Sequence, residues 1–118
     1  MMKIAIVPFV TNGRTSQVGH DGYLNVFKKS RSTVLRENLE SALKEDQISA
    51  EIIVDVNHGD LQALKRDGVN LMLLPSDVAI YVDYSDISSN EYYKLSENEY
   101  EKGEVTHIIE YIKAYHLD

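Results

Sequence analysis

The chain has 118 residues, of which 43% are hydrophobic and 26% charged, as expected for one globular domain over 1–118 and not for a disordered chain. It has no cysteine, which excludes disulfides, thiolate metal sites and a cysteine nucleophile. The net charge of −7 argues against nucleic acid and anionic membrane as partners, and the lack of a signal-peptide pattern favours the cytoplasm.

The first predicted element is a strand over residues 3–10, which are apolar at nearly every position, as in a parallel sheet covered on both faces. Residues 11–23 predict a long polar loop with three glycines. An apolar stripe at helical spacing then predicts a helix from about Ser30, capped by Ser30 or Ser32. The stripe also extends backwards, so a start nearer Gly22 stays open.

A second buried strand is predicted over residues 50–56, where isoleucine and valine dominate. Asp60 is a helix cap for the short helix 61–66 that follows. The next strand is predicted over 69–74, and it stops at Pro75 because proline has no N–H for the ladder. Strands separated by helices of this length require right-handed crossovers and therefore a parallel sheet.

The segment after the third strand has two interpretations. Ser76 can cap a short helix, whereas residues 78–84 also alternate like a strand. We favour the helix because a parallel sheet needs a third crossover at this point. The remaining pattern predicts a loop over 83–91, a strand over 92–95 and a last amphipathic helix over about 104–116.

The order of these elements predicts an α/β protein with a small three-layer, flavodoxin-like fold and a four-stranded, mainly parallel sheet. Three stretches of the chain match the pattern of a known family: Lys3-Ile4-Ala5-Ile6-Val7 before a loop with Thr15-Ser16, Val69 to Pro75 followed by Val78-Ala79-Ile80-Tyr81, and Tyr100-Glu101-Lys102-Gly103 before the last helix. In these stretches the chain resembles the IIB component of the lactose/cellobiose class of the bacterial sugar phosphotransferase system, and the resemblance implies the same fold and a bacterial protein.

One departure from that family changes what is expected of the chemistry. The resembling proteins carry a phosphate on a cysteine at the end of the first strand, and Pro8 or Phe9 stands there in this chain. Neither side chain accepts a phosphoryl group, so the carrier activity does not come over with the fold. The loop after the first strand is also longer here by roughly ten residues than a tight phosphate loop.

The loop Thr11-Asn12-Gly13-Arg14-Thr15-Ser16 has the residue types of an anion nest: a glycine for an unusual turn, hydroxyls, and a guanidinium for bidentate contact. It predicts a site for a phosphate-type anion or a phosphorylated small molecule, and an ordinary solvated loop is the alternative. A flavin such as FMN, stacked on Tyr81 or Tyr84, is a further alternative. We predict no cofactor.

Two positions are weak candidates for catalysis. In the pair His20-Asp21 the aspartate would orient the imidazole, which would act as a base or phosphoryl acceptor. His58 is predicted at the carboxyl end of the second strand, the edge at which α/β proteins place their sites. We predict no metal site, because His107 and His116 are nine residues apart on the last helix and do not form a chelating pair.

The negative charge and the tyrosines share the C-terminal third. Residues 83–118 hold three Lys or Arg against nine Asp or Glu, whereas residues 1–82 hold nine against ten. Tyrosine gives a large contact area with a polar end, so this third predicts a surface for a protein partner or for a homodimer. The alternative is packing at the edge of the core. The tyrosines of this predicted interface are Tyr92, Tyr93, Tyr100, Tyr111 and Tyr115.

The sequence therefore predicts a non-enzymatic interaction or regulatory module that senses an anion after the first strand and binds a protein through its C-terminal third. A small phosphoryl-transfer protein or enzyme that uses His20 or His58 is the first alternative, and a binder of FMN or a nucleotide is the second. The basic group Lys28, Lys29, Arg31 and Arg36 is interpreted as a solvated helix face.

Overall fold

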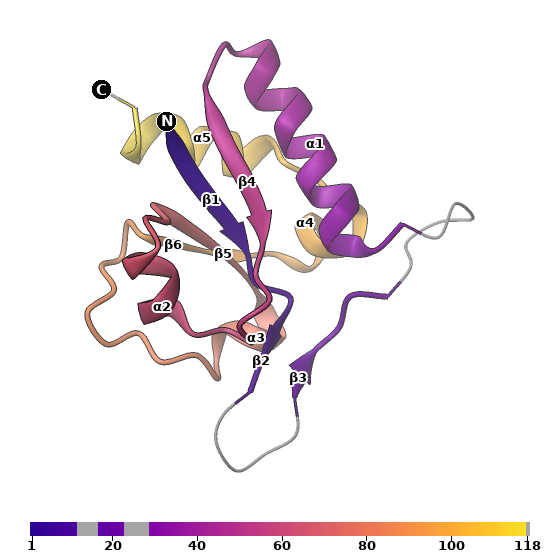
Figure 1. Cartoon of the computed structure of the whole chain (residues 1–118). Coiled ribbons are helices and arrows are strands. Elements are labelled where there is room, and N and C mark those ends of the chain that lie inside the picture. The colour runs from indigo at the N-terminus through magenta and orange to yellow at the C-terminus, as the bar shows by residue number, and fades with distance from the viewer. Residues whose placement is uncertain (12–16, 23–28, 118) are drawn as a thin grey trace.

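The computed structural model describes residues 1–11, 17–22 and 29–117. A sheet of four parallel strands in the order β4-β1-β5-β6 forms the middle layer, with helices on both faces (Figure 1). This is the flavodoxin-like strand order, so the predicted three-layer α/β fold is confirmed. The elements are β1 (Met2–Ile6), β2 (Phe9–Val10), β3 (Val18–Gly19), α1 (Arg31–Glu45), β4 (Ala50–Val54), α2 (Leu61–Arg66), β5 (Leu71–Pro75), α3 (Ser76–Ala79), β6 (Tyr92–Leu95), α4 (Glu97–Lys102) and α5 (Thr106–Tyr115).

The core lies on both faces of the sheet, because alternate residues of each strand point to opposite sides. In β1, Ile4 and Ile6 pack on the face covered by α1, α4 and α5, whereas Ala5 packs on the face covered by α2 and α3. β5 repeats the pattern and is buried along its whole length. β5 is therefore apolar throughout and β1 is apolar from Ile4 onward, which is why the sequence marks these two central strands so clearly.

β1 is shorter than predicted and ends at Ile6. The Val7 N–H still donates to the Leu73 carbonyl oxygen, over 3.0 Å. Pro8 has no N–H to continue the ladder, and the chain turns away after it. The predicted strand over 3–10 is thus wrong in its last part, where Phe9–Val10 forms β2 of a separate hairpin.

The second strand of this hairpin, β3, lies in a stretch that was predicted to be loop. Val18 pairs with Val10 and Gly19 with Phe9, in antiparallel register. Gly19 has a φ of +117°, and a Cβ there would come within 2.1 Å of the Pro8 carbonyl oxygen and 3.0 Å of Val78 Cγ2. The hairpin consequently sits on the end of β1 and against α3, where the arrowheads of the sheet point in Figure 1.

Two helix starts follow the predicted caps. Ser30 precedes α1, and its hydroxyl accepts the Thr33 N–H; Asp60 precedes α2, and its carboxylate accepts the Ala63 N–H over 3.0 Å. The segment after β5 is the short helix α3, as favoured. The predicted cap of this helix is wrong, however. Ser76 is the first residue of the helix, and Pro75 stands at the N-cap position without a side-chain hydrogen bond.

The structure also contains a helix that the sequence analysis did not assign. α4 begins with a capping box, in which the Ser96 hydroxyl accepts the Glu99 N–H and the Glu99 carboxylate accepts the Ser96 N–H. It ends at Gly103, which has a φ of +72°. The bounds of α2 and β6 are as predicted, and the remaining predicted boundaries shift by at most two residues. Across the described ranges no helix combines the length and apolar character needed to span a membrane.

Candidate functional site

The carboxyl edge of the sheet, meaning the edge at which the four parallel strands end, is the usual place for a site in this fold. Ligands bind there beside the switch point, which lies between β1 and β5. In this protein the hairpin occupies that point, because β3 lies against both Pro8 and α3. Two histidines flank it: His20 directly follows β3, and His58 lies in the turn between β4 and α2.

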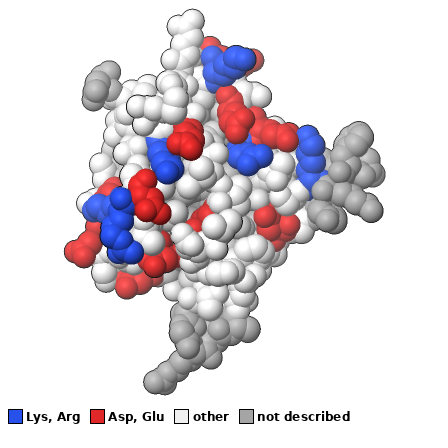
Figure 2. All heavy atoms as spheres, in the orientation of Figure 1, with Lys and Arg blue, Asp and Glu red and all other residues white. Residues whose placement is uncertain are grey.

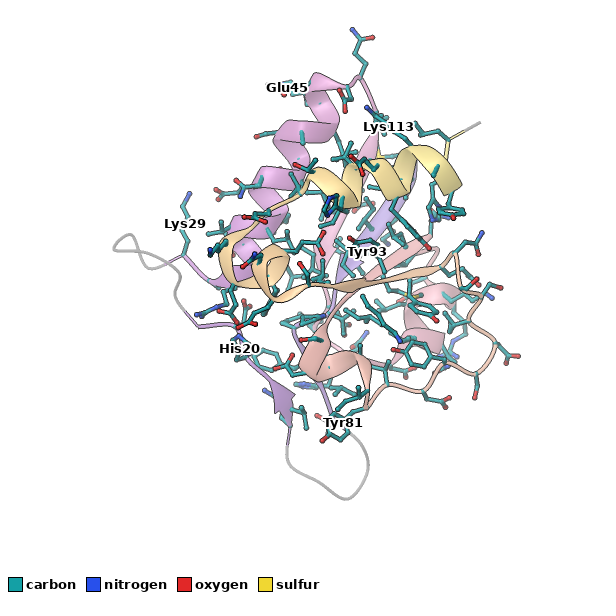
Figure 3. All side chains as sticks on the ribbon, turned by 180° about the vertical axis from the view of Figure 1, so that it is seen from behind. His20, Lys29, Glu45, Tyr81, Tyr93 and Lys113 are labelled. Atoms are coloured by element: carbon teal, nitrogen blue, oxygen red, sulfur yellow. The ribbon has the colours of Figure 1, made fainter. Side chains whose placement is uncertain are left out.

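His20 is held by two carboxylates from different helices. Its Nδ1 lies 3.2 Å from Asp77 Oδ2 in α3, and its Nε2 lies 2.5 Å from Glu101 Oε1 in α4. The imidazole also packs edge-on against the Tyr100 ring, with 5.3 Å between ring centroids. With both ring nitrogens engaged, His20 tethers the chain after the hairpin to the two helices (Figure 3).

Glu101 links this cluster to the start of α1. Its Oε2 accepts a hydrogen bond from Arg31 Nε over 2.5 Å, while Arg31 Nη1 donates to the Gly22 carbonyl oxygen. Burial raises the pKa of Glu101, but the hydrogen bonds from Arg31 and His20 outweigh it, so the net pKa lies below the ordinary value. Of the predicted basic group, Arg31, Lys29 and Arg36 are paired with glutamates, and Lys28 lies outside the described residues.

Asp21 does not orient His20, contrary to the predicted pairing of these neighbours. Its two carboxylate oxygens accept from the N–H and the hydroxyl of Ser32, over 2.7 and 2.6 Å. Ser32 is the second residue of α1, and only 2% of it is exposed. Asp21 therefore caps α1 from outside the helix, and the two adjacent residues serve different elements.

Tyr100 lies beneath this segment. It was predicted at a partner surface, but only 3% of it is exposed, and it belongs to the core packed against α1. Its hydroxyl donates to the His20 carbonyl oxygen over 2.5 Å. Burial, and then the charge and hydrogen bond of Asp21, raise the pKa of Tyr100 above that of a free tyrosine. The role of Tyr100 is to anchor residues 20–21.

His58 lies on the other side of the hairpin in a tight turn. It has a φ of +55°, and Gly59 has one of +83°. The buried Asp55 carboxylate accepts the N–H groups of Asn57 and Gly59 over 2.9 and 2.8 Å, and Thr11 N donates to the His58 carbonyl oxygen. The backbone of this turn is thus fixed, while the His58 side chain is exposed at the edge.

A cavity of about 400 Å³ opens beside this turn. Its walls come from the end of β2, the turn after β4, the first residues of α2 and the chain after α3. One exposed apolar side chain, that of Tyr81, lines it, and two more belong to residues next to its lining in the chain: Val56 directly precedes Asn57, and Ile80 directly precedes Tyr81. The lining residues are Val10, Thr11, Asn57, His58, Gly59, Asp60, Gln62, Tyr81 and Asp83.

The predicted anion loop is described only at its first residue. Thr11 donates its N–H to the His58 carbonyl oxygen, so this group is not free for an anion. The other five residues of the loop, 12–16, lie outside the described residues. The anion site stays a prediction.

The other predicted interface tyrosines are distributed over the C-terminal third and contact one another. Tyr93 and Tyr115 both pack against the Tyr111 ring, at centroid distances of 5.1 and 4.8 Å. The Tyr111 hydroxyl donates to backbone carbonyls of Ser89 and Tyr92, which ties α5 to the start of β6. Of this group Tyr115 is the most exposed, at 61%. A partner surface or homodimer in this region stays a prediction.

Several residues that the sequence analysis did not name as candidates for a site build this edge. Asp77 and Glu101 hold His20, and Asp60 and Asp83 face the cavity. Glu101 belongs to α4, whose Ser96-to-Glu99 capping box was a readable signal. Asp77 and Asp83 lie close to residues of the hairpin and its flanks because of the strand order. The residues next to them in the sequence do not predict this proximity.

Comparisons of this chain with models of protein families, with curated proteins and with solved structures found no match. Over the part of the chain that the structure describes, no three His, Cys, Asp or Glu side chains are grouped so as to hold a metal ion. The functional interpretation is therefore based on the geometry of the carboxyl edge.

Proposed function

We propose that this protein is a non-enzymatic interaction module, built like the phosphotransferase IIB component, which binds a protein partner at its carboxyl edge. The observation that carries the proposal is the group of exposed apolar side chains beside the cavity. Val56, Ile80 and Tyr81 are 81, 75 and 46% exposed. Exposed apolar groups gathered at one edge are typical of a contact surface.

The engagement of two of the three candidate catalytic residues, His20 and Asp21, supports a non-enzymatic role. Both ring nitrogens of His20 face carboxylates, and both oxygens of Asp21 serve the start of α1. In the place where the resembling family keeps its phosphorylated cysteine, Pro8 and Phe9 lead into the hairpin. The β2–β3 hairpin lies against Pro8 and α3 at the end of β1.

Photocrosslinking from the edge tests the proposal. We would replace Tyr81 with p-benzoylphenylalanine in the cells of origin, and Glu45 at the exposed end of α1 as the control position. We expect one protein, either a partner or a second copy of this chain, to crosslink from position 81 and not from position 45. The purified partner should then bind the unmodified chain.

A charge introduced on the apolar group sharpens the same test. Ile80→Asp should weaken the reconstituted complex by about tenfold or more, because a carboxylate would be desolvated in the contact. Leu117→Asp, which changes an exposed leucine near the opposite end of the chain, should leave the affinity unchanged. Absence of a crosslinked partner, or turnover of a phosphorylated substrate that His20→Ala abolishes, would refute the proposal.

A further inference from the structure

The cavity beside His58 has features that define what kind of partner group enters it, and this inference rests on the proposed function. The volume of about 400 Å³ lies within the range of roughly 300–1,000 Å³ in which proteins hold small groups. It opens at the carboxyl edge, where Tyr81 connects its lining to the exposed apolar group. A partner segment on Val56 and Ile80 would therefore have the cavity within reach of a neighbouring side chain.

The walls of the cavity are fixed before any partner arrives. The Asp55 carboxylate and the Thr11 N–H hold the turn around His58. On the opposite wall Gln62 Nε2 donates to the carbonyl oxygens of Asp83 and Ser85, over 2.9 and 2.7 Å. A preformed site loses less conformational entropy on binding, so this geometry favours insertion of a group into the cavity.

Two carboxylates from different walls decide the sign of the charge that the cavity accepts. Asp60 Oδ1 accepts from Ala63 N, and Asp83 Oδ1 accepts from the N–H and hydroxyl of Ser85. The side-chain and backbone hydrogen bonds from Ser85 lower the pKa of Asp83, so it stays ionised at neutral pH. Within the described residues, neither Asp60 nor Asp83 is paired with a lysine or arginine, and neither Oδ2 accepts a hydrogen bond.

Two other acidic groups of the same edge have basic partners. Asp77 is paired with His20, and Glu101 is paired with His20 and Arg31. Figure 2 shows the same alternation on the face that it draws, where basic and acidic groups mostly lie next to one another. At the cavity, no lysine or arginine among the described residues is paired with Asp60 or Asp83.

We infer that the cavity receives a lysine or arginine side chain of the partner, carried on an otherwise apolar segment that contacts Val56 and Ile80. The ammonium or guanidinium group donates to Asp60 Oδ2 and Asp83 Oδ2 in charge-assisted hydrogen bonds. The Tyr81 ring, on the cavity wall, offers its face to the same cation. The negative net charge of the chain steers a basic segment toward the edge.

Capped peptides test this inference by NMR titration of the isotope-labelled protein. The first probe is N-acetyl-leucyl-arginyl-phenylalanine amide, the second replaces its arginine with neutral citrulline, and the third is N-acetyl-arginine amide alone. We expect the first probe to shift the amide signals of Tyr81 and Asp83, and the citrulline peptide to bind about tenfold more weakly, because charge-assisted hydrogen bonds are lost.

Matched variants locate the effect. The double variant Asp60→Asn, Asp83→Asn should bind the arginine peptide about tenfold more weakly or worse. Asparagine at position 60 still caps α2, so the fold is preserved. Glu45→Gln, which removes one negative charge at the end of α1, should leave the affinity unchanged. Equal affinity for the arginine and citrulline peptides would overturn the inference, and so would binding of N-acetyl-arginine amide as tight as that of the tripeptide.

The two proposals fail in different ways. If position 81 crosslinks a partner that binds the double asparagine variant as tightly as the unmodified protein, the interaction function stands. The inference that a basic side chain of the partner enters the cavity is then refuted. If no protein crosslinks from position 81, the interaction function itself fails. In that case peptide binding would show a cation site without a protein partner, which also contradicts the inference.

Discussion

The two histidines of the carboxyl edge show how one edge of a sheet can be closed on one side and open on the other. His20 is tethered by Asp77 and Glu101, and the chain around it is anchored by Tyr100 and Asp21. His58 is also held by backbone hydrogen bonds, but its side chain lines a cavity with unpaired carboxylates among the described residues. In Figure 3, His20 and Tyr81 mark the closed and the open side at the hairpin end of the molecule.

The difference teaches that a histidine beside carboxylates is not by itself a sign of catalysis. On the closed side the polar groups satisfy one another and stabilise the hairpin, which is their structural role. On the open side the hydrogen bonds shape the walls and leave the acidic oxygens available. We therefore expect changes on the closed side to affect the free energy of unfolding, and changes on the open side to affect binding.

The largest expected effect comes from Gly19→Ala, at the base of the closed side. The new Cβ would lie 2.1 Å from the Pro8 carbonyl oxygen, and the residue has a φ of +117°. The hairpin must move to relieve this contact, so we expect a loss of about 3 kcal/mol or more in the free energy of unfolding. Urea denaturation followed by circular dichroism measures it.

Gly68→Ala is the matched control for that variant. Gly68 has a φ of +88°, but a Cβ there would meet nothing within 4 Å. The control isolates the cost of the left-handed backbone, about 1–2 kcal/mol. Equal losses for the two glycine variants would mean that the hairpin does not rest firmly on the end of β1.

Asp21→Ala should produce the next largest effect. It leaves the N–H and the hydroxyl of Ser32 without this partner, and Ser32 is buried at the start of α1. We expect a loss of about 2 kcal/mol in the free energy of unfolding.

The open side provides the comparison for Asp21. His58→Asn keeps a residue type that tolerates a positive φ, and it should change the free energy of unfolding by no more than about 0.5 kcal/mol. The same urea denaturation serves both variants. A larger loss at position 58 than at position 21 would reverse the assignment of closed and open sides.

A smaller effect than that of Asp21→Ala is expected from the pH dependence of the closed side. Because the pKa of Glu101 is lowered in the folded protein, its ion pairs stabilise the fold above the unfolded pKa of about 4.5, and this stabilisation is lost as the pH falls through the folded value. We expect the contribution to be below about 1 kcal/mol, since the carboxylate is partly exposed and screened by solvent.

Glu101→Gln tests that contribution. The variant should be less stable at about pH 7, and the difference from the unmodified protein should shrink as the pH falls below about 4.5. Unfolding midpoints in urea between about pH 7 and pH 3 measure this, with Glu45→Gln as the control. A difference that stays constant over this range would show that the ionised Glu101 does not stabilise the fold.

Much of the fold could be predicted because its signals are local. The continuous apolar runs of β1 and β5 and the caps Ser30 and Asp60 are readable from neighbouring residues. The prediction failed at the end of β1, where Phe9–Val10 continues the apolar run but pairs with β3 instead. Apolar character alone does not tell which partner a strand will find.

The candidate site was less predictable. His20 and His58 were singled out from the sequence, and the structure places both at the carboxyl edge. The interpretation of His20-Asp21 as a pair failed because the side chains of neighbouring residues diverge, one toward α3 and α4 and the other toward α1. The acidic residues around the cavity carried no signal, since two separated aspartates have no recognisable spacing.

The sequence by itself determined most of the core and the type of most elements, because hydrophobic period, caps and prolines act over a few residues. Only the tertiary structure decided which distant groups meet at the carboxyl edge. His20 contacts Asp77 and Glu101, which are 57 and 81 residues away in the sequence. Such contacts depend on strand order and on where the hairpin rests, and these are set by packing across the whole chain.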